Sequence, residues 1–190
     1  MTVHGKELGG YASRAYAESL SEFGEPIHLP RCGGYLLKRP IPGTAWHDAM
    51  GCYPLFFCAD WGALEADLAE LPSEIVSVSL VADPFGNYSL ERLESAFDVV
   101  NPYRVHYIVN LEAPPEETGS KHHRHEARKA LEKIQVEVCK EPASFSEDWN
   151  KLYQALAVRH GIRGIRAFSR RAFERQLAIP GMVAAKVKAK

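Results

Sequence analysis

Cysteine is scarce in this chain of 190 residues, and the spacing of the four that occur marks neither a metal site nor a disulfide framework. The four cysteines are Cys32, Cys52, Cys58 and Cys139. They contain no CxxC pair and no zinc-ligand spacing. This pattern favours reduced, structural thiols in a cytoplasmic protein, without a bound metal.

Long apolar runs are also missing. Residues 1–20 contain no basic segment followed by an apolar stretch, which argues against a secretory signal. No run approaches the ~20 apolar residues that a membrane span requires, so we expect no membrane span. The apolar content of 46% is ordinary for a globular protein and is enough to bury a core.

Several catalytic signatures do not occur. Neither GxxxxGK[ST] nor GxGxxG is present, which argues against a nucleotide-binding loop, and the absence of GxSxG argues against a serine hydrolase. Cysteine–histidine catalysis stays open, because Cys52 and Cys58 lie near His47 in the sequence, although nothing marks a thiolate.

Charge is present in both signs but is unevenly distributed. Residues 1–120 carry 7 Lys and Arg against 17 Asp and Glu, and residues 121–190 carry 16 against 7. The net charge of −1 therefore conceals a dipolar chain, and the basic end favours an anionic ligand or partner. The alternative is that the acidic and basic parts face each other or are simply solvated.

Hydrophobic periodicity predicts interleaved helices and strands up to residue 111. Helices are predicted over residues 12–23, 61–71 and 89–97. Strands are predicted over residues 34–41, 50–58, 75–82 and 104–111. Pro54 indicates that the second of these strands is an edge strand or carries a bulge. The interleaving favours an α/β (α+β) sheet flanked by helices over an all-α bundle.

The last third starts with a polar loop over residues 113–120. A basic helix over 121–133 and a strand over 135–139 follow. A capping box of Ser144 and Glu147 predicts the start of the next helix, which Gly161 ends. One buried face is predicted for that helix from the spacing of Trp149, Leu152, Tyr153 and Leu156.

A further helix is predicted after Ser169 as N-cap, with Phe173 and Leu177 one turn apart. The final residues alternate Lys with Val and Ala, which predicts a strand with one apolar face at the C-terminus. Such a face would favour self-association into a homodimer.

Basic side chains share a face of the helix KHHRHEARKALEK. Arg124 and Arg128 are four residues apart, so that their guanidinium groups could grip a phosphate or carboxylate, with Lys121 nearby. The alternative is a solvated face, partly paired with Glu126 and Glu132. The adjacent histidines point apart on a helix and have no metal-ligand spacing, which argues against zinc.

The segment RHGIRGIR over residues 159–166 combines cations with glycines. Arg159, His160 and Arg163 flank turns whose backbone N–H groups could face an anion. A basic connector between two helices is the alternative interpretation.

Three segments of the last third, HRHEARKALEK, DWNKLYQALAVRHGIRG and AFSRRAFERQLAIPGM, resemble in order and spacing the FemAB-like branch of the GNAT-fold acyltransferases. The resemblance implies tandem GNAT-like units with a mixed, mainly antiparallel sheet flanked by helices. Residues 1–120 would form the first unit and residues 121–190 the start of a second. The Gly-rich turn that holds the pyrophosphate in members using acetyl-CoA is not found. We therefore expect a fragment or a truncated product, although a natural terminus protected by edge lysines stays an alternative.

The resemblance implies transfer of an acyl or aminoacyl group to the amine of a small molecule or peptide. The donor would be acetyl-CoA or another acyl-CoA, or an aminoacyl-tRNA. An anionic substrate or carrier would be held by Arg124, Arg128, Arg159 and Arg163, with His160 as a second choice for proton transfer. No catalytic residue is assigned. The alternative function is a non-catalytic module that binds an anionic ligand or nucleic acid, although the interleaved acids argue against nucleic acid other than tRNA.

Overall fold

The computed structural model describes residues 2–3, 6–7, 9–110, 112–114, 117 and 119–190. The chain divides into two compact units, each built from two segments of the sequence. Unit 1 consists of Met1–Tyr103 and Ala143–Met182, and unit 2 of Arg104–Pro142 and Val183–Lys190. The domain boundary expected at residue 120 falls within the first segment of unit 2 and stays a prediction.

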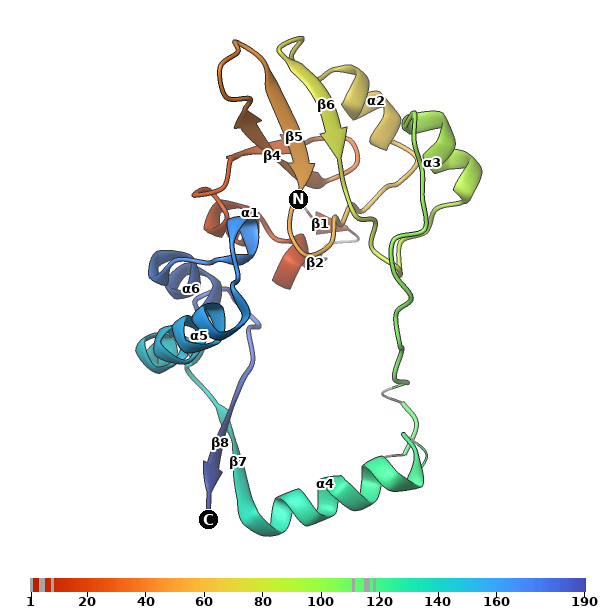
Figure 1. The fold of residues 1–190 in the computed structure, drawn as a ribbon. Helices are drawn as coiled ribbons and strands as arrows, with labels where there is room; N and C mark the ends of the chain where they lie inside the picture. Colours follow the sequence, from red (N-terminus) through yellow and green to blue (C-terminus); the bar gives the residue numbers. More distant parts are fainter. Residues whose placement is uncertain (1, 4–5, 8, 111, 115–116, 118) are drawn as a thin grey trace. The chain divides into compact units, whose positions relative to one another are not determined.

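A four-stranded sheet lies at the centre of unit 1 (Figure 1). Its strands follow chain order: β3 (Glu25–Leu29), β4 (Gly34–Pro40), β5 (His47–Gly51) and β6 (Ile75–Ser79). The first three pair antiparallel, whereas β6 runs parallel to β5. A parallel pair needs a crossover, and here that connection contains α2 (Leu64–Ala69). The predicted α+β class is confirmed.

Both faces of the sheet are covered. Leu36 and Leu37 are neighbours in β4, so their side chains point to opposite faces, and both are fully buried. Leu36 belongs to a core cluster that includes Leu64 of α2 and is packed against Leu93 of α3 (Leu90–Ala96). Leu37 belongs to a second cluster that includes Tyr16 of α1 (Arg14–Ser19). Unit 1 therefore has helices on both faces of its sheet.

The remaining elements of unit 1 are short segments near the N-terminus and the helices of the second segment. The N-terminal segments are β1 (Thr2–Val3), β2 (Lys6–Glu7) and η1 (Gly10–Ala12). The second segment contains α5 (Ser146–His160), η3 (Gly164–Arg166) and α6 (Arg170–Leu177).

The predicted ends of these helices are partly confirmed. Ser169 caps α6, because its Oγ accepts a hydrogen bond of 3.1 Å from the backbone N–H of Ala172. Gly161 ends α5 in the left-handed conformation, with a φ of 59°. The predicted capping box is wrong. Ser144 lies in a 3-10 helix, η2 (Pro142–Phe145), and the N-cap of α5 is Phe145, whose side chain makes no capping hydrogen bond.

The face of α5 that we predicted to be buried is largely exposed. The side chains of Leu152 and Leu156 are 63% and 45% exposed. Trp149 and Tyr153 do contact another element, since their rings lie 6.1 and 4.7 Å from that of Phe173 in α6. Helical spacing thus identified a shared apolar face, but α6 covers only its aromatic residues.

Two strand predictions are also corrected. The strand expected over residues 50–58 ends at Gly51, and Pro54 lies beyond it in the connection to α2, as expected for a residue that cannot donate to a ladder. Residues 104–110 form neither strand nor helix, and Leu111 lies outside the described residues. Val105 and Tyr107 are 86% and 98% exposed. The apolar alternation of these residues was not enough to form a strand, because a strand also needs a partner strand to pair with.

Unit 2 contains the basic helix and a two-stranded sheet. Helix α4 (Lys121–Lys133) has the predicted bounds, and its N-cap Ser120 accepts a hydrogen bond from the backbone N–H of His123. The antiparallel strands β7 (Ile134–Cys139) and β8 (Ala184–Ala189) pair along their whole lengths. The loop predicted over residues 113–120 lies partly outside the described residues.

Candidate functional site

The connections that follow β5 and β6 come together in unit 1. Because these strands are parallel, their carboxyl ends lie at the same edge of the sheet, where α/β proteins commonly bind ligands. The backbone N–H of Phe56 donates to the carbonyl of Val81 at 2.7 Å, and that of Asp83 donates to the carbonyl of Phe56 at 3.0 Å. These bonds tie the two connections to each other beyond the end of the sheet.

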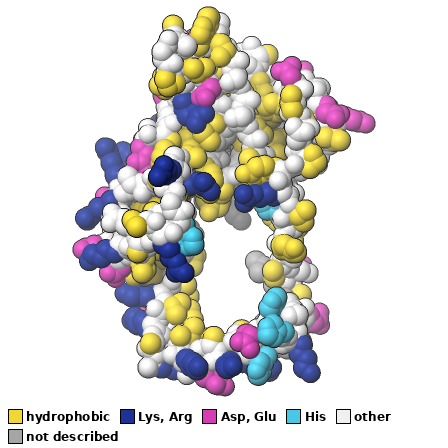
Figure 2. Space-filling view, in the orientation of Figure 1, with side chains coloured by type: hydrophobic (Ala, Val, Ile, Leu, Met, Phe, Trp, Pro, Cys, Tyr) yellow, Lys and Arg dark blue, Asp and Glu magenta, His cyan; other side chains and the backbone are white. Residues whose placement is uncertain are grey.

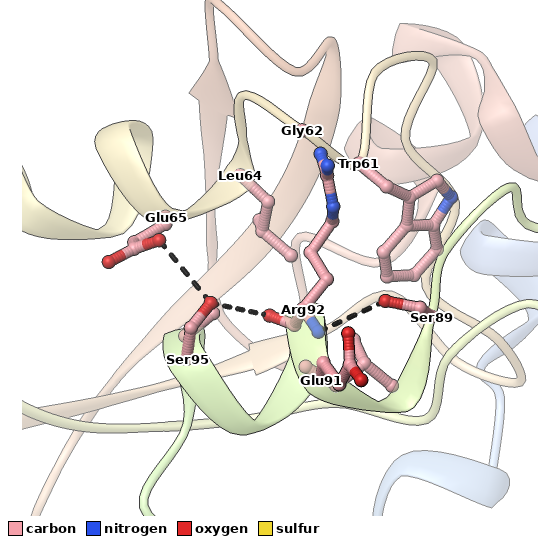
Figure 3. Close-up of a pocket in the computed structure, with 10 residues that line it drawn as sticks. Trp61, Gly62, Leu64, Glu65, Ser89, Glu91, Arg92 and Ser95 are labelled. Carbon is pink, nitrogen blue, oxygen red and sulfur yellow. Dashed lines mark hydrogen bonds between the residues drawn. The ribbon is translucent and has the colours of Figure 1, made fainter.

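A cavity of about 400 Å³ opens between the start of α2 and helix α3 (Figure 3). A second cavity, of about 380 Å³, adjoins the first. The two share four wall residues: Trp61, Gly62, Ser89 and Arg92. We call this pair of cavities the Arg92 site.

Trp61 anchors the Arg92 site in the protein core. Its side chain is buried, with its ring 5.7 Å from that of Phe56 and 4.5 Å from that of Tyr88. Gly86 lies against the indole, because a Cβ on this residue would come 2.6 Å from Trp61 Nε1. Aromatic contacts of this kind fix the ring and give the site a rigid wall.

Arg92 extends from α3 toward Gly62, between Leu64 and Trp61 in the view of Figure 3. The helix that carries it starts at Ser89, whose Oγ accepts a hydrogen bond from the backbone N–H of Arg92 at 3.3 Å. A Cβ at Gly62 would lie 2.3 Å from Arg92 Nη1, so the lack of a side chain at that position gives the guanidinium its space. Within the described residues this guanidinium forms no ion pair.

Carboxylates also line the Arg92 site. Glu65 and Glu91 lie on the wall of the first cavity and Asp60 on that of the second. Ser95 Oγ lies 3.4 Å from Glu65 Oε2, and Asp60 Oδ1 accepts a hydrogen bond of 2.8 Å from the backbone N–H of Gly62. The site therefore carries both charge signs on the walls of its two cavities, together with an aromatic wall.

The predicted basic residues are divided between the two units. Arg124 and Arg128 lie on α4 in unit 2, one turn apart on an exposed helix. Arg124 Nη1 donates a hydrogen bond of 2.7 Å to the carbonyl of Gly119, so this side chain also closes the turn before the helix. Figure 2 shows Lys, Arg and His side chains along α4. Neither arginine lines the cavities described above.

Arg159, His160 and Arg163 lie in unit 1, at and after the C-terminus of α5. Basic residues in the last turn of a helix interact favourably with its dipole. This interaction is enough to explain why Arg159 and His160 occur at the end of α5. The backbone N–H of Ile162 donates to the carbonyl of Ala157 at 3.0 Å and completes the helix end. The three residues thus lie in the segment that joins α5 to η3, and their role in binding an anion stays a prediction.

Cysteine–histidine catalysis loses support from the surroundings of the thiols. Burial raises the pKa of Cys52 to about 12. A hydrogen bond with Cys32 and, secondly, burial raise the pKa of Cys58. His47 Nδ1 is buried and has no hydrogen-bond partner in the described part of the chain, where no hydrogen bond joins His47 to either thiol.

Sequence reasoning missed Arg92, Trp61 and Gly62. The segments that carry them were predicted only as a helix over 61–71 and a helix over 89–97. Helices α2 and α3 follow strands β5 and β6, which are parallel. A prediction that these two strands are parallel would have placed the starts of the two helices close together.

The described residues bring together no group of three or more His, Cys, Asp or Glu side chains that could hold a metal ion. None of the helices described here has the length and apolar character needed to cross a bilayer. Comparison of the chain with protein-family models, curated proteins and solved structures finds no match in any of the three.

Proposed function

We propose that the chain is an N-acyltransferase of the FemAB-like, GNAT-fold type, acting in the cytoplasm on an amine. The observation that carries the proposal is the sheet of unit 1, which is mixed, mainly antiparallel and flanked by helices. This is the architecture that the resemblance of the last third implies. The free thiols of all four cysteines fit a reducing compartment.

In the proposed reaction the lone pair of the amine attacks the acyl carbonyl of the donor. The new N–C bond forms as the bond to the thiol of CoA, or to the ribose hydroxyl of tRNA, breaks, and the amine proton passes to a base or to the leaving group. Such a reaction depends mainly on positioning and on donors that face the developing oxyanion. The Arg92 site supports the proposal as a place where an acceptor could be held beside the parallel strands.

The second candidate function is binding of an anionic ligand through α4. It is favoured by the exposure of this helix, on which every side chain except that of Arg124 is exposed. Affinity based on these cations would fall steeply with salt, because binding releases counterions. Glu126 and Glu132 on the same helix weaken the candidate.

The test of the proposed function is a search for N-acylated products by mass spectrometry. The full chain is incubated with acetyl-CoA, a longer acyl-CoA or an aminoacyl-tRNA, each with a panel of primary amines. A product formed at a rate proportional to protein concentration supports the proposal. A chain that melts cooperatively but yields no product with any of the three donors contradicts it.

A thermal-shift titration with acetyl-CoA and free CoA at two salt concentrations separates the two candidate functions. A ligand that binds only the folded state raises its stability in proportion to occupancy. A saturable shift that is insensitive to salt supports an acyl-CoA donor. A shift that disappears at high salt and is lost in Arg128→Gln supports binding through α4.

A further inference from the structure

We propose that the Arg92 site binds a small zwitterion, an amine that also carries a carboxylate, such as an amino acid. Arg92 would receive the carboxylate, and the acidic side chains on the cavity walls would receive the ammonium group. That this zwitterion is the acyl acceptor rests on the proposed function. The binding itself does not.

The separation of opposite charges at the site is the first argument. Some arginines of unit 1 form direct ion pairs with carboxylates: Arg39 lies 2.7 Å from Asp48, and Arg170 lies 2.9 Å from Glu174. Arg92 lines a cavity together with Glu65 and Glu91, yet pairs with no carboxylate of the described residues. A ligand with one charge of each sign could bind the Arg92 guanidinium and a carboxylate of the cavity wall, which do not contact each other.

The shape of the cationic side is the second argument. A guanidinium presents parallel N–H groups that match the two oxygens of a carboxylate. At this site it lies against Gly62, whose lack of a side chain gives the guanidinium its space, and beside the buried ring of Trp61.

The carboxylates on the cavity walls disfavour ligands with a single charge. A simple anion at Arg92 would be repelled by Glu65 and Asp60, and a simple cation at these acids would be repelled by Arg92. Like-charge contacts of this kind are a common source of specificity. Each of the two cavities, of about 400 and 380 Å³, lies at the lower end of the range for small-molecule sites, so each is large enough for a single amino acid.

The proposal is tested by nitrogen-15 NMR of the full chain titrated with L-alanine. Propionate, which lacks the amine, and L-alaninamide, which lacks the carboxylate, are the matched probes. We expect L-alanine to shift the amide resonance of Gly62 and the indole resonance of Trp61, with each single-charge probe binding at least tenfold more weakly. The indole resonances of Trp46 and Trp149 are internal controls, since neither residue lines the site.

Arg92→Gln keeps a polar side chain, shorter than that of arginine, but removes its charge, and we expect it to weaken L-alanine binding at least tenfold. Arg170→Gln is the matched control, because Arg170 is an exposed arginine of unit 1 that pairs with Glu174 outside the site. We expect this variant to bind as the unchanged chain does. Equal binding of propionate and L-alanine, or unchanged binding by Arg92→Gln, would overturn the proposal.

The L-alanine titration and the search for N-acylated products can fail independently of each other, so their results distinguish the two proposals. Saturable shifts with L-alanine but no N-acylated product from any donor would contradict the acyltransferase and leave the zwitterion site in place. N-acylated products from other amines, with no L-alanine shift at millimolar concentration, would overturn the zwitterion site and leave the acyltransferase in place.

Discussion

The carboxylate of Asp67 accepts a hydrogen bond from the backbone N–H of Cys32, with an Oδ2···N distance of 2.7 Å. The same carboxylate also accepts from the backbone N–H of Arg31, at 3.0 Å. Asp67 lies on α2, and its side chain is 1% exposed. One buried acid therefore holds the turn between β3 and β4 against the crossover helix.

We expect Asp67→Ala to lower the free energy of unfolding by roughly 2–4 kcal/mol, because two backbone donors would lose their partner in a buried place. Urea unfolding followed by circular dichroism measures this change. Glu18→Ala is the control, since the half-exposed side chain of Glu18 forms its only ion pair among the described residues with Arg14, one turn away on α1. Its expected effect is below about 0.5 kcal/mol. Similar losses in both variants would contradict a special role for Asp67.

The sequence allowed the elements around Asp67 to be predicted, but not the role of this residue. Period-2 alternation identified β6, and helical spacing with Ser89 identified α3, because both patterns are local. Asp67 was one acid among several on an amphipathic helix. Its function depends on a turn 35 residues earlier in the chain, and only the packed fold brings the two together.

The same limit applied to the candidate site. Arg124 and Arg128 were nominated because a basic run is visible in the sequence. Arg92 is isolated between acids in its own segment, so no local pattern marks it. Its importance comes from Gly62 and Trp61, which the parallel pairing of β5 and β6 brings beside it.

Leu37 and Leu152 should respond differently to truncation, although both occur in apolar patterns. Leu37 is fully buried in the core between the sheet and α1, whereas Leu152 of α5 is 63% exposed. We expect Leu37→Ala to cost about 2–5 kcal/mol of unfolding free energy and Leu152→Ala less than about 1 kcal/mol. Denaturant titration measures both. A loss from Leu152→Ala as large as that from Leu37→Ala would mean that another surface covers this face of α5 in solution.

Thiol labelling should separate Cys139 from the other cysteines. Cys139 is partly exposed, whereas Cys32, Cys52 and Cys58 are buried. Burial also raises the pKa of Cys52 to about 12, so at pH 8 this group is almost entirely a thiol and not the reactive thiolate. We expect one cysteine to react with maleimide at least tenfold faster than the rest in the folded chain.

Cys139→Ser should remove that fast phase, and labelling in urea should make the remaining cysteines react at similar rates. A fast phase that persists in Cys139→Ser would show that one of the buried thiols opens to solvent.

Lys38 and Glu74 give a dependence on pH whose sign follows from their contact. Lys38 Nζ lies 3.0 Å from Glu74 Oε1, and this hydrogen bond is the main reason why the pKa of Glu74 is lowered from 4.5. A carboxyl group whose pKa is lower in the folded state stabilises the fold above its unfolded pKa. That contribution is lost as the pH falls through the folded pKa.

We therefore expect Glu74→Gln to melt below the unchanged chain at pH 7, with the difference constant down to about pH 5.5 and shrinking below pH 4.5. The size is small, because the pair is partly exposed and screened by solvent. Thermal melts across this pH range measure the difference, and Glu94→Gln, which changes an exposed glutamate of α3, corrects for the loss of one charge. If the difference for Glu74→Gln grew as the pH fell, the hydrogen bond from Lys38 would not be the interaction that stabilises the carboxylate.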